Sequence, residues 1–254
     1  MELNLSALQM LQPISLEEMD AVALLNRKDT KFVFPLARLS AVLEQLSDSY
    51  RVLTINNKRW TEYDNLYFDT PERYCYYQHH NRRLNRFKFR IREYVGSDLA
   101  FFEIKFKSNR ERTIKSRMKI PSSVRELTGE IAAFIREKSP FNPEEMEPSI
   151  SIGFTRITLV SHDLTERATL DIGLEASGNN KMVQFNNIVI AESKQDGIIS
   201  GSQFKVALRM NNSIEQRISK YCICLSRTEP ELKSNLFKPK HLNINKLKKF
   251  VANE

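Results

Sequence analysis

The 254-residue chain contains few glycines and cysteines, and it has no long apolar run. With seven glycines it has neither a GxGxxG nor a GxxxxGK(S/T) motif, which argues against the Rossmann and P-loop modes of phosphate binding. It lacks both a run of about 18 apolar residues and a signal peptide, so we expect a cytoplasmic protein without a transmembrane segment. Cys75, Cys222 and Cys224 have no paired CxxC spacing, and we expect them to be unpaired thiols that serve packing.

Positive charge is abundant, and its excess is local. Residues 81–119 contain 13 Lys and Arg but 4 Asp and Glu, a net charge of +9, whereas the whole chain carries +8. The remaining residues are therefore close to neutral. A concentrated excess of one sign predicts a polyanionic partner for this stretch.

Within this stretch, cations and apolar residues alternate as they do along β-strands. Successive side chains of a strand point to opposite faces, so one face of each strand is cationic and the other is apolar. Like charges side by side on a sheet repel each other, and a bound phosphate chain would relieve this repulsion. The cationic faces contain Arg86, Lys88, Arg90 and Arg92 in the first strand, Lys105 and Lys107 beside Glu103 in the second, and Lys115, Arg117 and Lys119 in the third.

The rest of the chain predicts an α+β protein made of one antiparallel barrel with peripheral helices. Helices are expected at 15–25 and 36–47, and a third is expected to begin at Pro71 with Asp69 or Thr70 as its cap. Strands are expected at 27–35, 50–56, 60–68, 149–161 and 166–176. We expect one long strand or two over residues 182–195, and a helix followed by a loop over 121–147. Residues 203–210 and 214–227 are expected to be helical or mixed. We expect a single domain over 1–254, with a core at about 14–227 and a basic tail at 228–254 that is loosely ordered from Lys233.

Two carboxylates on the predicted strands have two interpretations. Glu103 lies among lysines and Glu192 precedes a Ser-Lys pair, so each could simply pair with a neighbouring base. Each could instead hold Mg²⁺ or Mn²⁺, which take few protein carboxylates and fill their shell with water and phosphate oxygens. The adjacent His79 and His80 make a poor metal pair, and we expect them at the surface. Aromatic residues near the strands (Tyr67, Tyr74, Tyr77 and Phe102) are more often core than a platform for a nucleobase.

An ordered series of short motifs resembles a known family. RKDTKF, YFDTPERY, RFKFRIREY, FEIKFK, KSR, GFTRI, RATLD, AESK and RISKY follow one another over residues 14–227 as in the VTC-type polyphosphate polymerase domain. This domain belongs to the triphosphate tunnel metalloenzyme superfamily and is related to CYTH proteins. The resemblance implies an antiparallel β-tunnel lined with Lys and Arg. It also implies transfer of the γ-phosphate of ATP to a growing polyphosphate chain, assisted by Mn²⁺ or Mg²⁺.

The resemblance also implies roles for individual residues. Catalytic contacts with the transferred phosphate fall to Arg90, Arg92, Lys105, Arg156 and Arg167, and metal binding falls to Glu192 and Glu103. Further phosphate contacts fall to Lys31, Arg86, Lys88, Lys115, Arg117, Lys194, Arg217 and Lys220. Related triphosphatases carry an ExExK motif on their first strand, but this chain has Arg27, Asp29 and Lys31 there, which favours the polymerase.

Three alternatives remain at this stage. One is a tunnel-fold triphosphatase, and another is a domain that binds polyphosphate without turnover. The third is a nucleic-acid-binding module, but its aromatics should share a face with the cations, whereas Phe87, Phe89, Phe102 and Phe106 alternate away from them. We therefore expect ATP and polyphosphate as ligands, no nucleic acid, and room for a membrane-associated partner that receives the product.

Overall fold

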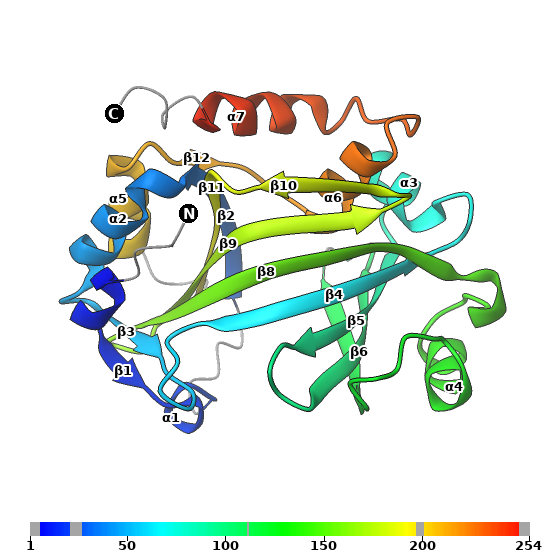
Figure 1. The fold of residues 1–254 in the computed structure, drawn as a ribbon, viewed down its shortest axis with the longest axis horizontal. Helices are drawn as coiled ribbons and strands as arrows, with labels where there is room; N and C mark the ends of the chain where they lie inside the picture. The colour runs from blue at the N-terminus through cyan, green and yellow to red at the C-terminus, as the bar shows by residue number, and fades with distance from the viewer. Residues whose placement is uncertain (1–5, 21–26, 111, 197–200, 249–254) are drawn as a thin grey trace.

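The computed structural model describes residues 6–20, 27–110, 112–196 and 201–248, which form one large sheet surrounded by helices (Figure 1). The strands are β1 (Gln12–Ile14), β2 (Arg27–Pro35), β3 (Tyr50–Leu53), β4 (Thr61–Asp69), β5 (Arg86–Tyr94), β6 (Leu99–Lys107), β7 (Thr113–Ile120), β8 (Glu147–Ser161), β9 (Glu166–Gly178), β10 (Lys181–Phe185), β11 (Ile188–Asp196) and β12 (Ile214–Glu215). The α-helices are α1 (Leu16–Asp20), α2 (Leu39–Leu46), α3 (Tyr74–His80), α4 (Gly129–Lys138), α5 (Gln203–Met210), α6 (Lys220–Thr228) and α7 (Lys238–Lys248), and short 3₁₀ turns lie at Ser6–Met10, Leu36–Arg38 and Pro143–Glu145.

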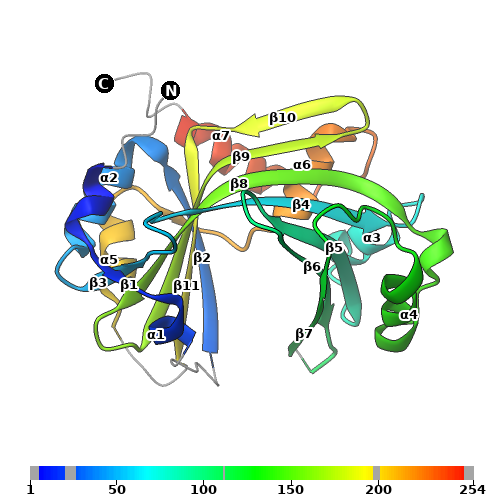
Figure 2. The same cartoon turned by 60° about the horizontal axis from the view of Figure 1, so that its bottom comes forward.

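The main path of the sheet is antiparallel and follows the order β12-β2-β11-β9-β8-β4-β5-β6-β7. Figure 2 shows its shape as an arch, with β4, β8 and β9 across the top and with β2 and β11 descending on one side and β5 to β7 on the other. Register shifts at Tyr67/Phe68 and Gly153/Thr155 add local bends to the normal twist of the sheet. The predicted antiparallel tunnel fold is confirmed. Among the described strands, however, no pairing joins β7 to β2 or β12, so the sheet is curled without being closed by hydrogen bonds.

Two large apolar clusters pack on the outside of the arch, and a third packs on its inside. Phe89 and Phe102, predicted on the apolar faces of the basic strands, are fully buried and pack with Ile131 and Ile135 of α4. Their burial leaves the cationic faces of β5 and β6 for the inside of the arch. The second outer cluster lies under α2 and α5. The inner cluster lies beside the cations, on the same strand faces as Lys31 and Glu192, and it packs with α3, α6 and the segment that leads into α7.

Several predicted elements are present with shifted ends. The capping box that opens α1 is formed, because Ser15 and Glu18 exchange backbone–side-chain hydrogen bonds of 2.9 and 3.2 Å. This helix ends at Asp20, and its predicted continuation lies outside the described residues. Residues 182–195 divide between β10 and β11. The cysteines are buried and free, as expected.

The start of α3 and the C-terminal segment differ from the predictions. Helix α3 begins at Tyr74 instead of Pro71, because Arg73 has a left-handed backbone with φ of +59°. The Asp69 carboxylate accepts hydrogen bonds from the amides of Cys75 and Tyr76 and so caps the helix from a distance. The expectation of loose order from Lys233 is wrong, since α7 forms and its neighbour Phe237 is fully buried.

The expectation that His79 and His80 lie at the surface is also wrong. His80 is 7% exposed, and its ring packs against Phe237 at a centroid distance of 5.6 Å. His79 is half-buried, and its ring centroid lies 6.0 Å from that of Phe237. The two histidines therefore help to hold the segment before α7 against α3.

Candidate functional site

The register of β5, β6 and β7 arranges the predicted cations in rows across one wall of the arch. Lys88 lies opposite Lys105, which lies opposite Lys115. Arg90 lies opposite Glu103, which lies opposite Arg117, by the same pairings. Directly paired residues share a face of a sheet, so these side chains all belong to the inner face.

The other wall is formed by β2, β11 and β9. Glu192 lies opposite Lys31 on one side and Thr169 on the other, and Lys194 lies opposite Arg167. The two walls influence each other although they are far apart in the sheet. Enclosure by protein, followed by repulsion from Lys31, Lys88 and Lys115, lowers the pKa of Lys105 to about 7. Burial and the charges of Arg156, Lys115 and Arg167 lower the pKa of Lys194 to about 8, against the opposing effect of Glu192. The charge of Lys31 on β2 thus acts on Lys105 of β6, and the charge of Lys115 on β7 acts on Lys194 of β11.

Lys105 is surrounded by other charged groups yet remains exposed to solvent. We call the inner face of the arch, lined by Lys31, Lys88, Arg90, Arg92, Lys105, Lys115, Arg156, Glu192 and Lys194, the concave site. Its enclosure strengthens electrostatic interactions with any anion that enters.

Two arginines of the concave site are held by neighbours from β4 and β6. Arg90 donates from Nε to Glu103 Oε2 at 2.6 Å and from Nη1 to the Tyr67 hydroxyl at 3.1 Å. Arg92 donates from Nε to Asn65 Oδ1 at 2.9 Å, and burial followed by repulsion from Arg90 lowers its pKa to about 10. Asn65 is itself fully buried and fixed by a hydrogen bond to Ile152 O. Both guanidinium groups are therefore oriented before any ligand arrives.

A buried ion triad joins β8, β9 and α6. Arg156 forms two parallel hydrogen bonds with the Asp171 carboxylate, of 2.6 and 2.8 Å, and Lys220 binds the same carboxylate. Although burial opposes ionisation, the charges of Arg156 and Lys220 hold the pKa of Asp171 well below its usual range. Two cations share one carboxylate, so the triad keeps a net positive charge.

The N-terminal end of α6 meets the concave site. The Ser219 hydroxyl caps this helix and accepts a hydrogen bond of 2.6 Å from Lys88 Nζ, and Lys31 Nζ reaches Ile218 O at 3.5 Å. The Tyr221 ring stacks on that of Tyr67, with centroids 5.1 Å apart. Helix α6 thereby connects β2, β4 and β5 across the inside of the arch.

The carboxylates of the site differ in how strongly they are engaged. Glu103 and Asp171 are hydrogen-bonded to arginines, whereas the Glu192 oxygens have Lys31 Nζ and Lys194 Nζ at 4.0 Å each. Burial opposes ionisation of Glu192, but these two lysines lower its pKa to about 2. Within the described ranges no group of three His, Cys, Asp or Glu residues could hold a metal ion. The Glu192 carboxylate, which both lysines approach only at 4.0 Å, would fit a divalent cation as a single protein ligand, with phosphate oxygens and water as the others.

One polar atom next to Glu192 has no partner. The Oγ1 atom of Thr169 is buried and makes no hydrogen bond within the described structure, and the residue is 3% exposed. Such an atom costs stability unless a ligand or water satisfies it. Its position opposite Glu192 in the register places this unsatisfied group among the cations of the site.

Other predicted site residues lie at the margins. Arg117 is exposed and lies 5.0 Å from the Phe101 ring centroid, and Arg86 donates to Arg83 O at the start of β5. Arg217 is exposed, and its charge acts on Lys240 of α7. Sequence reasoning assigned no part of the phosphate site to Asn65, Tyr67, Asp171, Thr169, Ser219 and Tyr221. Alternation along the sequence of β9 does place Thr169 and Asp171 on one face with Arg167, but it does not predict their partners.

The comparison with protein families agrees with the motifs that line this site. The VTC domain model matches residues 26–228. The chain belongs to the VTC-domain family. The match covers every strand of the main sheet path and α6, so the concave site lies wholly within the VTC domain, whereas α7 lies beyond it.

Solved structures give more distant likenesses to this VTC domain. The PH1819 protein from Pyrococcus horikoshii OT3 is 12% identical, with a TM-score of 0.46, and the match covers 79% of this chain and 99% of that one. A putative adenylyl cyclase from Hippeastrum, HpAC1, described as having a dominant triphosphatase activity, is 14% identical with a TM-score of 0.46; the match covers 78% and 95%. The comparison with curated proteins found no significant match. Among the described helices, none has the length and apolar character to cross a membrane.

Proposed function

We propose that the concave site binds the triphosphate of ATP and transfers its γ-phosphoryl group to the end of a polyphosphate chain. The observation that carries this proposal is the strand register, which places the cations of β5 to β7 and those of β2 and β11 on the inner face of one arch, where the charge of Lys31 acts on Lys105. A linear polyanion between the walls would relieve this repulsion along its whole length.

The oriented arginines suit the transferred group. Phosphoryl transfer requires in-line positioning and stabilisation of charge on the equatorial oxygens, with little covalent work by the protein. Arg90 and Arg92 are fixed by Glu103 and Asn65, so their remaining N–H groups can meet those oxygens without reorganisation. We assign the γ-phosphoryl group to these two arginines with Lys105, Arg156 and Arg167, and the flanking phosphates to Lys31, Lys88, Lys115, Lys194 and Lys220.

The reaction exchanges one phosphorus–oxygen bond for another. The bond between the γ-phosphorus and its bridging oxygen breaks, a terminal oxygen of the chain bonds to that phosphorus, and ADP leaves with the electron pair. A terminal phosphate oxygen is largely ionised at neutral pH, since the second pKa of a phosphate ester is about 6, and so the attack needs no general base. Attack by water does need a proton acceptor, but Glu103 and Asp171 are engaged with arginines, and we assign Glu192 to the metal. This favours transfer over hydrolysis.

Glu192 would hold the divalent cation, Mn²⁺ or Mg²⁺. Such an ion supplies charge neutralisation between phosphate oxygens when it is bound. On the protein side, Lys31 and Lys194 keep the Glu192 carboxylate ionised and aligned between β2 and β9.

The deciding experiment is incubation with ATP and Mn²⁺ or Mg²⁺, followed by separate measurement of long-chain polyphosphate and of free phosphate. We expect metal-dependent polymer, and release of free phosphate without polymer would indicate a triphosphatase instead. Replacing both Arg90 and Arg92 by Ala should lower the rate at least 10²–10³-fold, as removal of preorganised donors does elsewhere. Arg136→Ala, which removes an exposed cation of α4, is the control. Metal-dependent turnover that survives Glu192→Gln would disprove the metal assignment.

A further inference from the structure

A second group of cations lies at one end of the concave site and includes a residue of α7. Arg82 follows α3, Arg86 and Lys88 begin β5, Arg217 precedes α6, and Lys240 belongs to the first turn of α7. We call these five residues, together with His79, the end cluster. No described carboxylate lies within ion-pair distance of any of its five cations.

Packing fixes α7 beside the concave site. Phe237, just before the helix, is fully buried, and its ring lies 5.6 Å from Tyr76 and 6.0 Å from His79 between centroids. Lys240 Nζ lies 5.5 Å from the centroid of the same ring. Farther along the helix, Asn243 donates to Gln216 Oε1 at 2.8 Å, next to Arg217. The ammonium group of Lys240 and the His79 ring thus both lie against Phe237.

The cations of the end cluster repel one another in the free protein. Burial and the charges of Lys88, Arg82 and Arg217 lower the pKa of Lys240. Repulsion by Lys88, followed by burial and by Arg86, Lys240 and Lys105, lowers the pKa of His79 well below its usual range, so that its imidazole is neutral at pH 7. Lys105 and Lys88 belong to the concave site, and this overlap shows that the two groups of cations are continuous.

His79 adds an unsatisfied hydrogen-bonding group. Its Nδ1 atom is buried without a partner, and the ring forms no hydrogen bond within the described part of the chain. A neutral imidazole can donate one hydrogen bond and accept another. Within the described residues, these five cations and the His79 ring are groups to which the oxygens of a phosphate chain could bind.

We propose that the end cluster is a second polyphosphate subsite, which uses Lys240 of α7 to hold chain phosphates that extend beyond the concave site. The inference rests on the proposed function for the identity of the long ligand, but its evidence is separate. It assigns a binding role to a helix outside the residues that the VTC domain model matches. It also predicts discrimination by length, because a triphosphate fills the concave site without reaching Lys240.

The test compares the affinities of inorganic tripolyphosphate and long-chain polyphosphate in the absence of ATP. Lys240→Gln should weaken long-chain binding about threefold to tenfold and reduce its salt dependence by roughly one unit of slope, as loss of one phosphate contact does for other polyanions. Its affinity for tripolyphosphate should stay within about twofold of the original, because the concave site is intact. Lys240→Arg should preserve long-chain binding.

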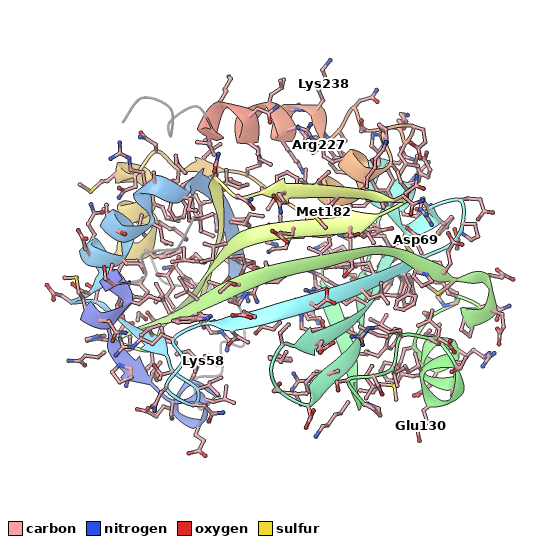
Figure 3. All side chains as sticks on the ribbon, in the orientation of Figure 1. Lys58, Asp69, Glu130, Met182, Arg227 and Lys238 are labelled. Carbon is pink, nitrogen blue, oxygen red and sulfur yellow. The ribbon has the colours of Figure 1, made fainter. Side chains whose placement is uncertain are left out.

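Lys238→Gln is the matched control, since it removes the same charge from the same helix. Lys238 is exposed and points away from the sheet (Figure 3). An equal effect of Lys238→Gln and Lys240→Gln would overturn the proposal, because it would indicate diffuse attraction, and so would a wild-type protein that does not bind long chains. His79→Leu should also weaken long-chain binding, and His79→Gln should restore part of it.

These outcomes separate the subsite from the proposed function. If ATP yields no polymer but Lys240→Gln still weakens long-chain binding selectively, the polymerase proposal fails and the subsite stands. If polymer forms and Lys240→Gln shows no selective effect, the subsite fails and the polymerase proposal stands.

Discussion

The Asp171→Asn substitution would test whether the ion triad of Arg156, Asp171 and Lys220 stabilises the VTC domain. Asp171 is 2% exposed and is shared by Arg156 and Lys220. Removing one partner of a buried ion pair typically costs 3–5 kcal/mol, because the remaining charge is left uncompensated. In a chain of this size, about 3–5 kcal/mol corresponds to a fall of roughly 6–20 °C in the unfolding midpoint.

A bound anion should compensate this substitution. At a hundredfold excess over its Kd, a ligand raises the free energy of unfolding by about 2.7 kcal/mol. Tripolyphosphate should stabilise Asp171→Asn by more than it stabilises the original protein, because its phosphates meet two cations that have lost their carboxylate. Thermal unfolding with and without tripolyphosphate measures both effects, and Asp98→Asn in an exposed turn is the control. A midpoint that falls no further than that of the control would refute the role of the triad.

The same triad predicts a pH dependence. A carboxylate whose pKa is depressed in the folded state contributes stability above its unfolded pKa of about 3.9, and this contribution is lost as the pH falls through the folded pKa. Since the folded pKa of Asp171 is depressed, the difference in stability between the original protein and Asp171→Asn should be full above about pH 5 and should shrink below about pH 4. A difference that stays constant into strong acid would contradict this assignment.

Three further predictions concern single side chains. The pKa of Lys105 is about 7 in the free protein, and a bound phosphate would raise it. Binding of tripolyphosphate near pH 7–8 should therefore take up a proton. Calorimetry in buffers of different ionisation enthalpy would detect this uptake, and equal heats of binding in all buffers would exclude it. Thr169→Val should leave the free energy of unfolding unchanged or raise it, because the hydroxyl that is lost has no partner among the described residues. The same substitution should weaken tripolyphosphate binding about threefold to tenfold. Undiminished affinity would contradict a contact between Thr169 and the ligand. Phe237→Ala should cost about 3–5 kcal/mol in urea unfolding, as for other buried aromatics, and a cost below about 1 kcal/mol would mean that α7 contributes little to folding.

Local patterns in the sequence predicted one wall of the site well. Alternation along 86–92 and 103–107 assigns cations and aromatics to opposite faces whatever the strands pair with, and the structure buries Phe89 and Phe102 accordingly. Such a pattern holds because side-chain direction in a strand depends on the backbone alone. Lys31 was assigned to the site through the family resemblance, and in the structure Glu192 lies opposite it in the register.

Local sequence patterns could not predict the contacts between segments that are distant in the chain. The pairing of Arg156 with Asp171 and Lys220 depends on strand register and on where α6 packs, and neither is a local property. The tail was misjudged because its many lysines and asparagines hide a narrow apolar stripe. Phe237, Ile244 and Leu247 are spaced by seven and three residues, which is a helical period, and all three are buried.

The open edge of the sheet has a consequence for behaviour in solution. Strand β7 pairs with β6 alone among the described strands, so its other side presents backbone groups that could template a strand from another molecule. Its exposed Lys115, Arg117 and Lys119 guard against this, because two such edges repel each other. The cations to which we assign polyphosphate binding would therefore also keep the molecules apart. A long chain that neutralises β7 would remove this protection and would itself link neighbouring copies of the protein.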